Sequence, residues 1–540
     1  MPIKKLIRHP LTFLIVLCLG IGIYKIAMLA CVSNDSVTFM QFAQELKTTP
    51  GSSIRSFDQH PGYPAIICAS EWVFGKMGYD RTLEQRIIAA QIATLMCRAI
   101  AICFLYTIFR FFGNKKTALV AATLVMLIPV YANNGSEVLS DWPNLMLMTI
   151  ALFFCLRGLR SVNHLCFLAA GLASGAAYWI RPEGAVFVGV MGIYALVHTF
   201  SRSTNKFQLW TCLGTMVVTA ALIAGPYMHY KGALFPKKKV GTFSRVNGTQ
   251  ASCLRLCGDD GLGCPACDRS TPTVLQHGSE ACVPLKNTFL RERLPIKNIS
   301  QHPIQAGIPG FSIAARPVKA ILHFVEKLFN TIFGFSIPLL GILLYKMKRF
   351  RRFRRLRRQD QFLILFTGLW LGLMVWLHCK TGYMSHRHIM PLVVLGFAWI
   401  LKGLHGLVLV FGTKRMHLHR NTAVLLGICI AIFVPKLIRP AHADKAVYKQ
   451  AGLWLRDNTP AESTLAVFDG RVGFYAERAY QPLNRTATLK QGYVIIKAAD
   501  ESVVLPETAL PIATGQANID KVIRIYAVGT GKDETADFTD

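Results

Sequence analysis

The stretch that decides the fold is LTFLIVLCLGIGIYKIAMLA, residues 11–30. A helix needs about 20 mostly apolar residues to cross the hydrocarbon core of a bilayer, and this run has that length. Similar runs recur almost to the end of the chain, which has 540 residues, 52% of them hydrophobic and only 16% charged. This composition is typical of a polytopic membrane protein and not of an ordinary soluble one.

By the same criterion the chain contains about eleven membrane-spanning helices, and we expect them to form an all-α membrane domain over residues 1–439. The short candidates near residues 143 and 164 leave open a tilted, re-entrant or merged arrangement. After residues 11–30, the candidates are residues 87–112, 117–132, 143–157, 164–180, 184–200, 208–229, 319–345, 361–379, 388–411 and 421–438.

The net charge of +31 has a topological explanation. A nucleic-acid site would gather Lys and Arg on one globular face, whereas here they lie in clusters between alternate apolar runs. By the positive-inside rule these clusters are cytoplasmic, so the N-terminus is inside and, after an odd number of spans, the C-terminal tail is outside. The densest cluster, residues 348–358, anchors this topology or binds anionic lipid headgroups. The others are Lys4, Lys5 and Arg8; Arg110, Lys115 and Lys116; Arg157 and Arg160; Arg202 and Lys206; and Lys414, Arg415 and Arg420.

Three long polar segments, residues 31–86, 231–318 and 440–540, are expected on the exterior side. The last predicts a small extracytoplasmic α/β domain of about 100 residues. It opens with an amphipathic helical pattern over residues 446–455, which ends near Pro460. Short apolar strands follow at residues 464–468, 493–497 and 522–527.

The second exterior loop is rich in cysteine. Because the exterior is oxidising, disulfides are the first interpretation, and a structural zinc site is the alternative, although six residues between the pairs is a tight spacing for zinc. The odd number predicts that one thiol stays free. The cysteines are Cys253, Cys257, Cys264 and Cys267, followed by Cys282.

Ionisable residues near the exterior face are the candidate site, because charges beside a bilayer are costly and mark function. Asp35 follows the first apolar run; it is either a surface carboxylate or a general base that deprotonates an acceptor hydroxyl. Asp58 and His60 precede a Pro61–Pro64 turn. His60 is either a structural histidine or a phosphate ligand, and with Asp35 and Asp58 it could hold a divalent ion such as Mg, Mn or Zn.

Three further residues complete the candidate set. Asp141 either caps the helix that begins there or faces the site. Arg181 and Arg387 are cations on the side that the positive-inside rule disfavours, and an anionic ligand such as a phosphate explains them. The alternative for both arginines is pairing with nearby carboxylates such as Glu183.

The order of these motifs resembles that of the bacterial membrane glycosyltransferases of the protein O-mannosyltransferase and lipid A aminoarabinose transferase superfamily, which have the GT-C fold. The resemblance covers nearly the whole chain. It rests on the first-loop acid, D-x-H-P-x-Y-P at residues 58–64, S-D-x-P at 140–143, R-P-E-G at 181–184, G-P-Y-x-x-Y at 225–230 and S-H-R-H-I-M-P at 385–391.

The resemblance implies sugar transfer from a polyprenyl-phosphate-linked donor to a protein, lipid or glycan acceptor, on the exterior face of a bacterial inner membrane. It implies that Asp35 is the base and that Arg387 binds the lipid phosphate. Asp58 and His60 would line the donor phosphate or metal region, and Asp141 and Arg181 the same cavity. Many relatives have a second acid after the first-loop aspartate, where this chain has Ser36, which puts metal use in doubt.

Two other classes of function compete with this interpretation. A transporter or flippase of a glycolipid or envelope precursor also places charges in a membrane, but such proteins typically have repeated halves, which this sequence lacks. A scaffold that uses its C-terminal domain for binding would leave Asp35 without a role.

Overall fold

The structure is a computed structural model that describes the chain over the ranges given below. Of residues 231–318, which are predicted to be exterior, only the first two are described, so the predictions for Cys253, Cys257, Cys264, Cys267 and Cys282 fall outside the described residues. The described residues are 9–79, 82–200, 206–232, 321–323, 325–326, 357–381, 385–395, 397, 427, 430–483, 492–498, 510–512, 514, 516, 519 and 522–528.

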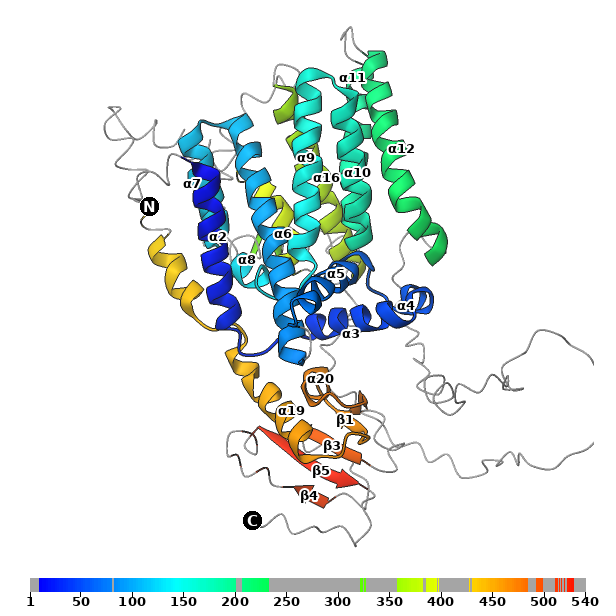
Figure 1. Cartoon of the computed structure of the whole chain (residues 1–540). Coiled ribbons are helices and arrows are strands. Elements are labelled where there is room, and N and C mark those ends of the chain that lie inside the picture. The colour runs from blue at the N-terminus through cyan, green and yellow to red at the C-terminus, as the bar shows by residue number, and fades with distance from the viewer. Residues whose placement is uncertain are drawn as a thin grey trace, which may run out of the picture. The chain divides into compact units, whose positions relative to one another are not determined.

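Long apolar helices dominate the described residues up to 381, as the sequence predicts (Figure 1). Among the described residues, six helices are long and apolar enough to cross a membrane, and a shorter one, α10 (His164–Ile180), packs between α9 and α12. The chain is therefore a multi-pass membrane protein. The six are α2 (Pro10–Ala27), α6 (Leu83–Phe112), α9 (Asp141–Ser161), η1 with α11 (Pro182–Ala185 and Val186–Thr199), α12 (Lys206–Lys231) and α16 (Arg358–Thr381).

The prediction of one span over residues 117–132 is wrong, because two helices share this stretch. α7 (Lys115–Leu127) ends before Ile128, whose backbone is extended, and the short α8 (Pro129–Asn134) begins directly after that residue. Pro129 has no N–H to continue the helix, and its ring disfavours a helical conformation at the residue before it. The predicted spans 319–345 and 388–411 lie largely outside the described residues, and span 421–438 is described only at 427 and 430–438, so the total of eleven remains a prediction.

The first segment predicted to be exterior, residues 31–86, is largely helical. It folds into α3 (Asn34–Thr48), α4 (Pro50–Ser56) and α5 (Gly62–Lys76), which leads to α6. α5 packs against both α3 and α6. This packing gives the segment that carries Asp35 a fixed position beside the long helices.

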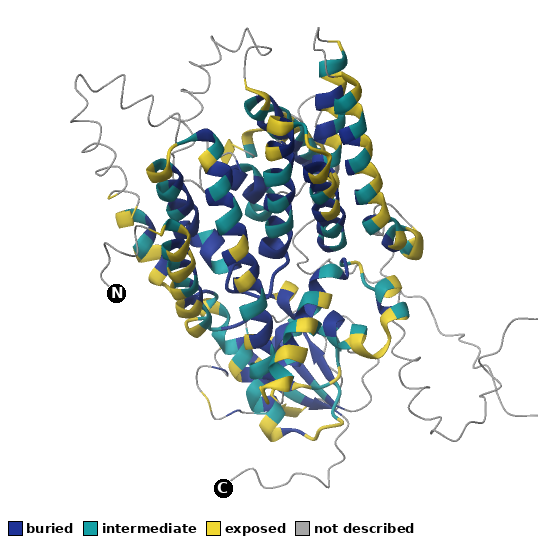
Figure 2. Ribbon diagram, turned by 45° about the horizontal axis from the view of Figure 1, so that its top comes forward, coloured by how far each residue is buried: buried dark blue, intermediate teal, exposed yellow. Residues whose placement is uncertain are grey.

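Burial follows the way the helices face one another (Figure 2). Small and aromatic side chains at the contacts are fully buried, such as Phe167 of α10 and Phe187 of α11. Large apolar side chains on the outer face of α12 are exposed instead, among them Phe207 and Leu222. Outward-facing apolar residues are expected where the solvent is lipid.

The C-terminal part forms a small mixed sheet with two helices. α19 (Ala446–Asn458) confirms the predicted amphipathic helix, and the three predicted strands correspond to β1, β3 and β5. β1 is parallel to β2 and β3, while β5 is antiparallel to β3 and β4, in the order β2-β1-β3-β5-β4. The strands are β1 (Leu465–Val467), β2 (Tyr480–Pro482), β3 (Gly492–Lys497), β4 (Leu510–Ile512) and β5 (Ile523–Val528), and the second helix is α20 (Gly470–Ala476). A domain boundary at residues 439 and 440 stays a prediction.

Candidate functional site

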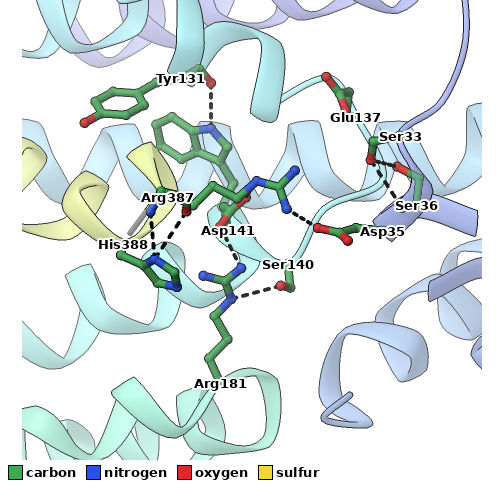
Figure 3. A network of polar contacts seen from close by, with 12 residues as sticks. Ser33, Asp35, Ser36, Tyr131, Glu137, Ser140, Asp141, Arg181, Arg387 and His388 are labelled. Carbon is green, nitrogen blue, oxygen red and sulfur yellow. Dashed lines mark hydrogen bonds and ion pairs between the residues drawn. The ribbon is translucent and has the colours of Figure 1, made fainter. Parts of the chain in front are cut away.

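Four charged side chains from four distant parts of the chain form a continuous network of ion pairs (Figure 3). Arg387 contacts Asp35 on one side and Asp141 on the other, and Arg181 contacts Asp141 from a third direction. All four residues are sequence-predicted site residues. The structure thus brings together residues separated by up to 352 positions.

Asp35 lies in the first turn of α3. Ser33 caps this helix, with its Oγ accepting a hydrogen bond from the N–H of Ser36 at 3.3 Å, so the cap does not depend on Asp35. The Asp35 side chain is half-exposed, at 51%, and accepts a hydrogen bond from Nη1 of Arg387. It is therefore the reachable acid of the network.

Asp141 is the buried acid of the network, with a side chain only 2% exposed. Its Oδ1 lies 2.8 Å from Nη2 of Arg181 and its Oδ2 lies 3.6 Å from Nε of Arg387. Neither carboxylate oxygen has an aligned hydrogen-bond donor among the described residues, so these contacts are ion pairs and Asp141 does not cap α9. The capping interpretation is wrong for this reason.

Arg181 follows the last residue of α10 in an extended conformation. Its Nε donates to the Oγ of Ser140 at 3.0 Å, while its Nη2 pairs with Asp141. Arg181 therefore pairs with a nearby carboxylate, as the alternative expects, but with that of Asp141 and not that of Glu183. Pro182 cannot continue α10 because it has no N–H, which explains why the chain turns there.

Arg387 lies at the start of the helical residues 386–395, next to both acids. Partial burial of the guanidinium opposes its charge, but the carboxylates of Asp141 and Asp35 outweigh burial and raise its pKa above the ordinary value. Two guanidinium groups balance two carboxylates, so the network as a whole is neutral. A phosphate entering it would compete with carboxylates for an arginine fork that suits either anion.

The first turn of α9, which carries Asp141, is held in place by Arg98 of α6, which is completely buried. Arg98 donates from Nη2 to the carbonyl of Met126 at 2.9 Å and lies 5.4 Å from the ring centre of Trp142. The indole N–H of Trp142 in turn donates to the carbonyl of Tyr131 at 2.8 Å. These contacts tie α6 and α7 to the first turn of α9.

Asp58 and His60 have different surroundings and are not among the four side chains of the network. Asp58 is exposed. His60 is 5% exposed, and its ring lies 5.7 Å from that of Tyr178 and 5.3 Å from that of Tyr227. Their assignment to the donor phosphate or to a metal stays a prediction.

The G-P-Y-x-x-Y stretch has a structural role that the sequence did not suggest. It ends α12, where Tyr227 packs on His60 and Lys231 donates to the carbonyls of Ile54, Arg55 and Phe57 at 2.7, 3.1 and 2.5 Å. The end of α12 thus holds α4 and the segment that bears Asp58.

Sequence reasoning missed two residues beside the network. Glu137 is 4% exposed and accepts from, or pairs with, Nε2 of His442 at 3.0 Å. Glu137 stands in the polar stretch before Asp141, but nothing in the sequence pairs it with a histidine 305 positions away. No cluster of three or more His, Cys, Asp or Glu side chains that could hold a metal occurs among the described residues.

Residues 80–228 match the family model described as dolichyl-phosphate-mannose-protein mannosyltransferase. No curated protein matches the sequence of the chain.

Solved structures resemble nearly the whole chain. ArnT from Cupriavidus metallidurans, crystallised with undecaprenyl phosphate, is 11% identical with a TM-score of 0.56, over 95% of this chain and 97% of that one. The oligosaccharyltransferase AglB from Archaeoglobus fulgidus, in complex with an inhibitory peptide and a dolichol-phosphate, is 11% identical with a TM-score of 0.51, over 88% of this chain and 64% of that one. The predicted resemblance to GT-C membrane glycosyltransferases is confirmed, and the chain has their fold.

Proposed function

Starting from the GT-C fold, we propose that this protein is a membrane glycosyltransferase. It transfers a sugar from a polyprenyl-phosphate-linked donor to a protein, lipid or glycan acceptor. Asp35 is the general base and Arg387 binds the phosphate of the donor. The reaction takes place on the extracytoplasmic face of a bacterial inner membrane, where Asp35 and the C-terminal domain lie.

The observation that carries the proposal is the position of Arg387 between an exposed acid and a buried one. The buried Asp141 keeps the guanidinium in place, because moving the arginine away would leave a desolvated carboxylate with one partner fewer. The exposed Asp35 is held less firmly, since ion pairs open to solvent are weak. A phosphate that reaches Arg387 therefore competes with Asp35 and not with Asp141.

This competition orders the reaction. When the donor phosphate takes the outer side of Arg387, the Asp35 carboxylate is released beside the anomeric carbon of the same donor. Asp35 then accepts the proton of the acceptor hydroxyl while the acceptor oxygen attacks that carbon. The bond between the sugar and the phosphate oxygen breaks, and the configuration at the anomeric carbon inverts because no covalent intermediate forms.

The leaving group is a lipid phosphate, which gains negative charge as the bond breaks. Arg387 is already placed to stabilise this charge, and a preorganised cation contributes most where charge develops in the transition state. Arg181 contributes indirectly, because its ion pair holds Asp141 in place. Since a phosphate leaves readily as an anion, the mechanism needs no general acid.

Among the described residues, no group of three or more His, Cys, Asp or Glu side chains that could hold a metal ion occurs. Asp35 and Asp141 each face an arginine, and Asp58 is exposed. No step of the mechanism is therefore assigned to a divalent cation, and metal dependence stays a prediction that a chelator tests.

A transporter of a glycolipid precursor is the competing function. A transporter would need its charged groups near the middle of the membrane, at the interface of two repeats. Here the network joins helix ends: the first turns of α3 and α9, and the residue after α10. This location favours chemistry at one face of the membrane.

The test is sugar transfer by the purified protein in detergent, with a panel of undecaprenyl-phosphate sugars and with or without EDTA. Asp35→Asn should abolish transfer while the protein folds normally, and Asp457→Asn, a change of the same kind at an exposed position of α19, should leave it intact. If the wild-type protein releases no lipid phosphate from any donor, or if Asp35→Asn is fully active, the proposed function is wrong.

A further inference from the structure

A short strap, residues 437–442, connects the helical residues 430–438 to the 3-10 helix η3 (Ala443–Lys445) that opens the C-terminal part. Hydrogen bonds from α2 hold its first three residues. The hydroxyl of Tyr24 donates to the carbonyl of Ile438 at 2.9 Å, and Nζ of the buried Lys25 donates to the carbonyls of Leu437 and Arg439 at 3.0 and 2.7 Å. These carbonyls end a helix and have no partner within it, so the end of α2 satisfies them.

On one side the strap contacts the segment that leads to Asp35. The N–H of Ala30 donates to the carbonyl of Ala441 at 3.3 Å, five residues before Asp35. Cys31 and Val32, which connect Ala30 to the cap of α3, are each only 1% exposed. The strap therefore fixes the entry of α3 through a buried segment.

On the other side the strap contacts the loop that leads to Asp141. Nε2 of His442 lies 3.0 Å from Oε1 of Glu137, and Glu137 is four residues before Asp141. The backbone of His442 is left-handed, with φ of 56° and ψ of 32°. This conformation is unfavourable for a residue with a Cβ, so the side-chain contact with Glu137 offsets a local cost.

We propose that His442 is a positioning residue for the reaction proposed above. In its protonated form His442 holds Glu137. The strap therefore sets the separation between the segment that leads to Asp35 and the segment that leads to Asp141. Arg387 has to contact Asp35 and Asp141 at the same time, so a shift of either segment breaks the network. The inference rests on the proposed function, and it assigns a role to a pair of residues outside the network itself.

The charges around His442 determine its titration. Glu137 faces the imidazole from the loop before α9, Arg471 from α20 and Asp444 from η3, while Lys25 and Arg387 act on Glu137. The hydrogen bond with Glu137 raises the pKa of His442 above its ordinary value, against the effect of burial. Because the pKa is raised on folding, the pair contributes fully below about pH 6.5, and its contribution is lost as the pH rises through the higher folded-state value.

The first experiment measures transfer from pH 5.5 to 9 for the wild-type protein, His442→Gln, His442→Lys and the control His164→Gln. His164 is an exposed histidine at the first residue of α10, away from the network. At pH 6, His442→Gln should lower kcat between about tenfold and a hundredfold, the range for a misplaced catalytic group, with a smaller change in donor KM. His442→Lys should restore kcat and keep it at high pH, where the wild type declines. A His442→Gln profile that overlays the wild type would overturn the inference and leave the proposed function standing.

The second experiment does not depend on activity. A double-mutant cycle on the thermal midpoint combines His442→Gln with Asp141→Asn, whose side chains are not in contact. If the strap positions the segment that leads to Asp141, the changes in midpoint caused by the two substitutions are non-additive at pH 6 and become additive at pH 8.5. Additivity at both values of pH would refute the positioning role of His442. This result can be obtained even if the wild type is inactive with every donor, so the inference and the proposed function are tested separately.

Discussion

At the scale of single residues, Asp35 and Asp141 show how burial divides the work of two carboxylates on one arginine. The side chain of Asp141 is 2% exposed and has two arginines beside it, whereas that of Asp35 is 51% exposed and has one. The buried acid fixes Arg387 and the exposed acid can exchange its place with a ligand. This difference gives a prediction that does not concern turnover.

Asp35→Asn should bind undecaprenyl phosphate more tightly than the wild type, although it transfers no sugar. Removing the charge of Asp35 removes the competitor for Arg387, and an exposed ion pair is worth at most about 1 kcal/mol, or about fivefold in Kd. Arg387→Gln should weaken binding by more than about tenfold, because it loses a charge-assisted hydrogen bond. Isothermal titration in detergent measures both. Equal or weaker binding by Asp35→Asn would contradict competition between the acid and the phosphate.

At the scale of elements, the first turn of α9 is positioned by residues buried within the helix bundle. Arg98 of α6 packs against Trp142, and Gly135 leaves the space for both. A Cβ at Gly135 would lie 2.4 Å from Cδ of Arg98 and 2.9 Å from Nε1 of Trp142. The glycine is needed here for the close approach of side chains and not for its backbone, since its φ is −82°.

Gly135→Ala should therefore destabilise the protein by about 1–3 kcal/mol, the usual cost of overpacking a filled core. Gly214→Ala is the matched control, because no atom lies within 4 Å of a Cβ built at that position of α12 and alanine favours a helix. Thermal unfolding in detergent should give a lower midpoint for the first variant and an equal or higher one for the second. Equal midpoints for Gly135→Ala and the wild type would mean that Arg98 and Trp142 can move apart freely.

At the scale of the whole molecule, the C-terminal sheet and its helices are joined to α3 by a few specific contacts. The hydroxyl of Tyr475 in α20 accepts from the buried N–H of Val32 at 3.1 Å, and that of Tyr480 in β2 accepts from Gln41 at 2.9 Å. Arg86 also pairs with Glu477 at 3.9 Å and Arg456 with Glu84 at 3.8 Å, at partly exposed positions. The buried hydrogen bond should carry most of the attachment.

Tyr475→Phe should cost about 1–3 kcal/mol, since it leaves the N–H of Val32 buried without an acceptor. Tyr480→Phe should cost less than about 1 kcal/mol, because Gln41 is only half-buried and can turn to water. Raising NaCl to 1 M should hardly change the midpoint of either variant, as exposed ion pairs contribute little and are screened by salt. A large loss of stability in salt would instead assign the attachment to the surface ion pairs.

The sequence by itself determined the features that depend on local composition. Apolar runs such as residues 11–30 predict membrane helices because any segment of that length and hydropathy is driven into lipid. The amphipathic period of residues 446–455 and the strands of the C-terminal domain were equally readable. The sequence also indicated Asp35, Asp141, Arg181 and Arg387 as candidate site residues, because charges beside apolar runs are costly and suggest a functional role. Its error over residues 117–132 arose from hydropathy that ignored the effect of Pro129.

Only the tertiary structure decided which of these residues meet. Asp35 and Arg387 are 352 positions apart, and no pattern in the sequence distinguishes their pairing from that of Arg181 with Glu183. The structure also placed His60 among tyrosines and joined Glu137 to His442. The physical reason is that an ion pair depends on distance and burial, which come from helix packing. A residue's chemistry is encoded locally, whereas its partner is fixed only when distant helices pack.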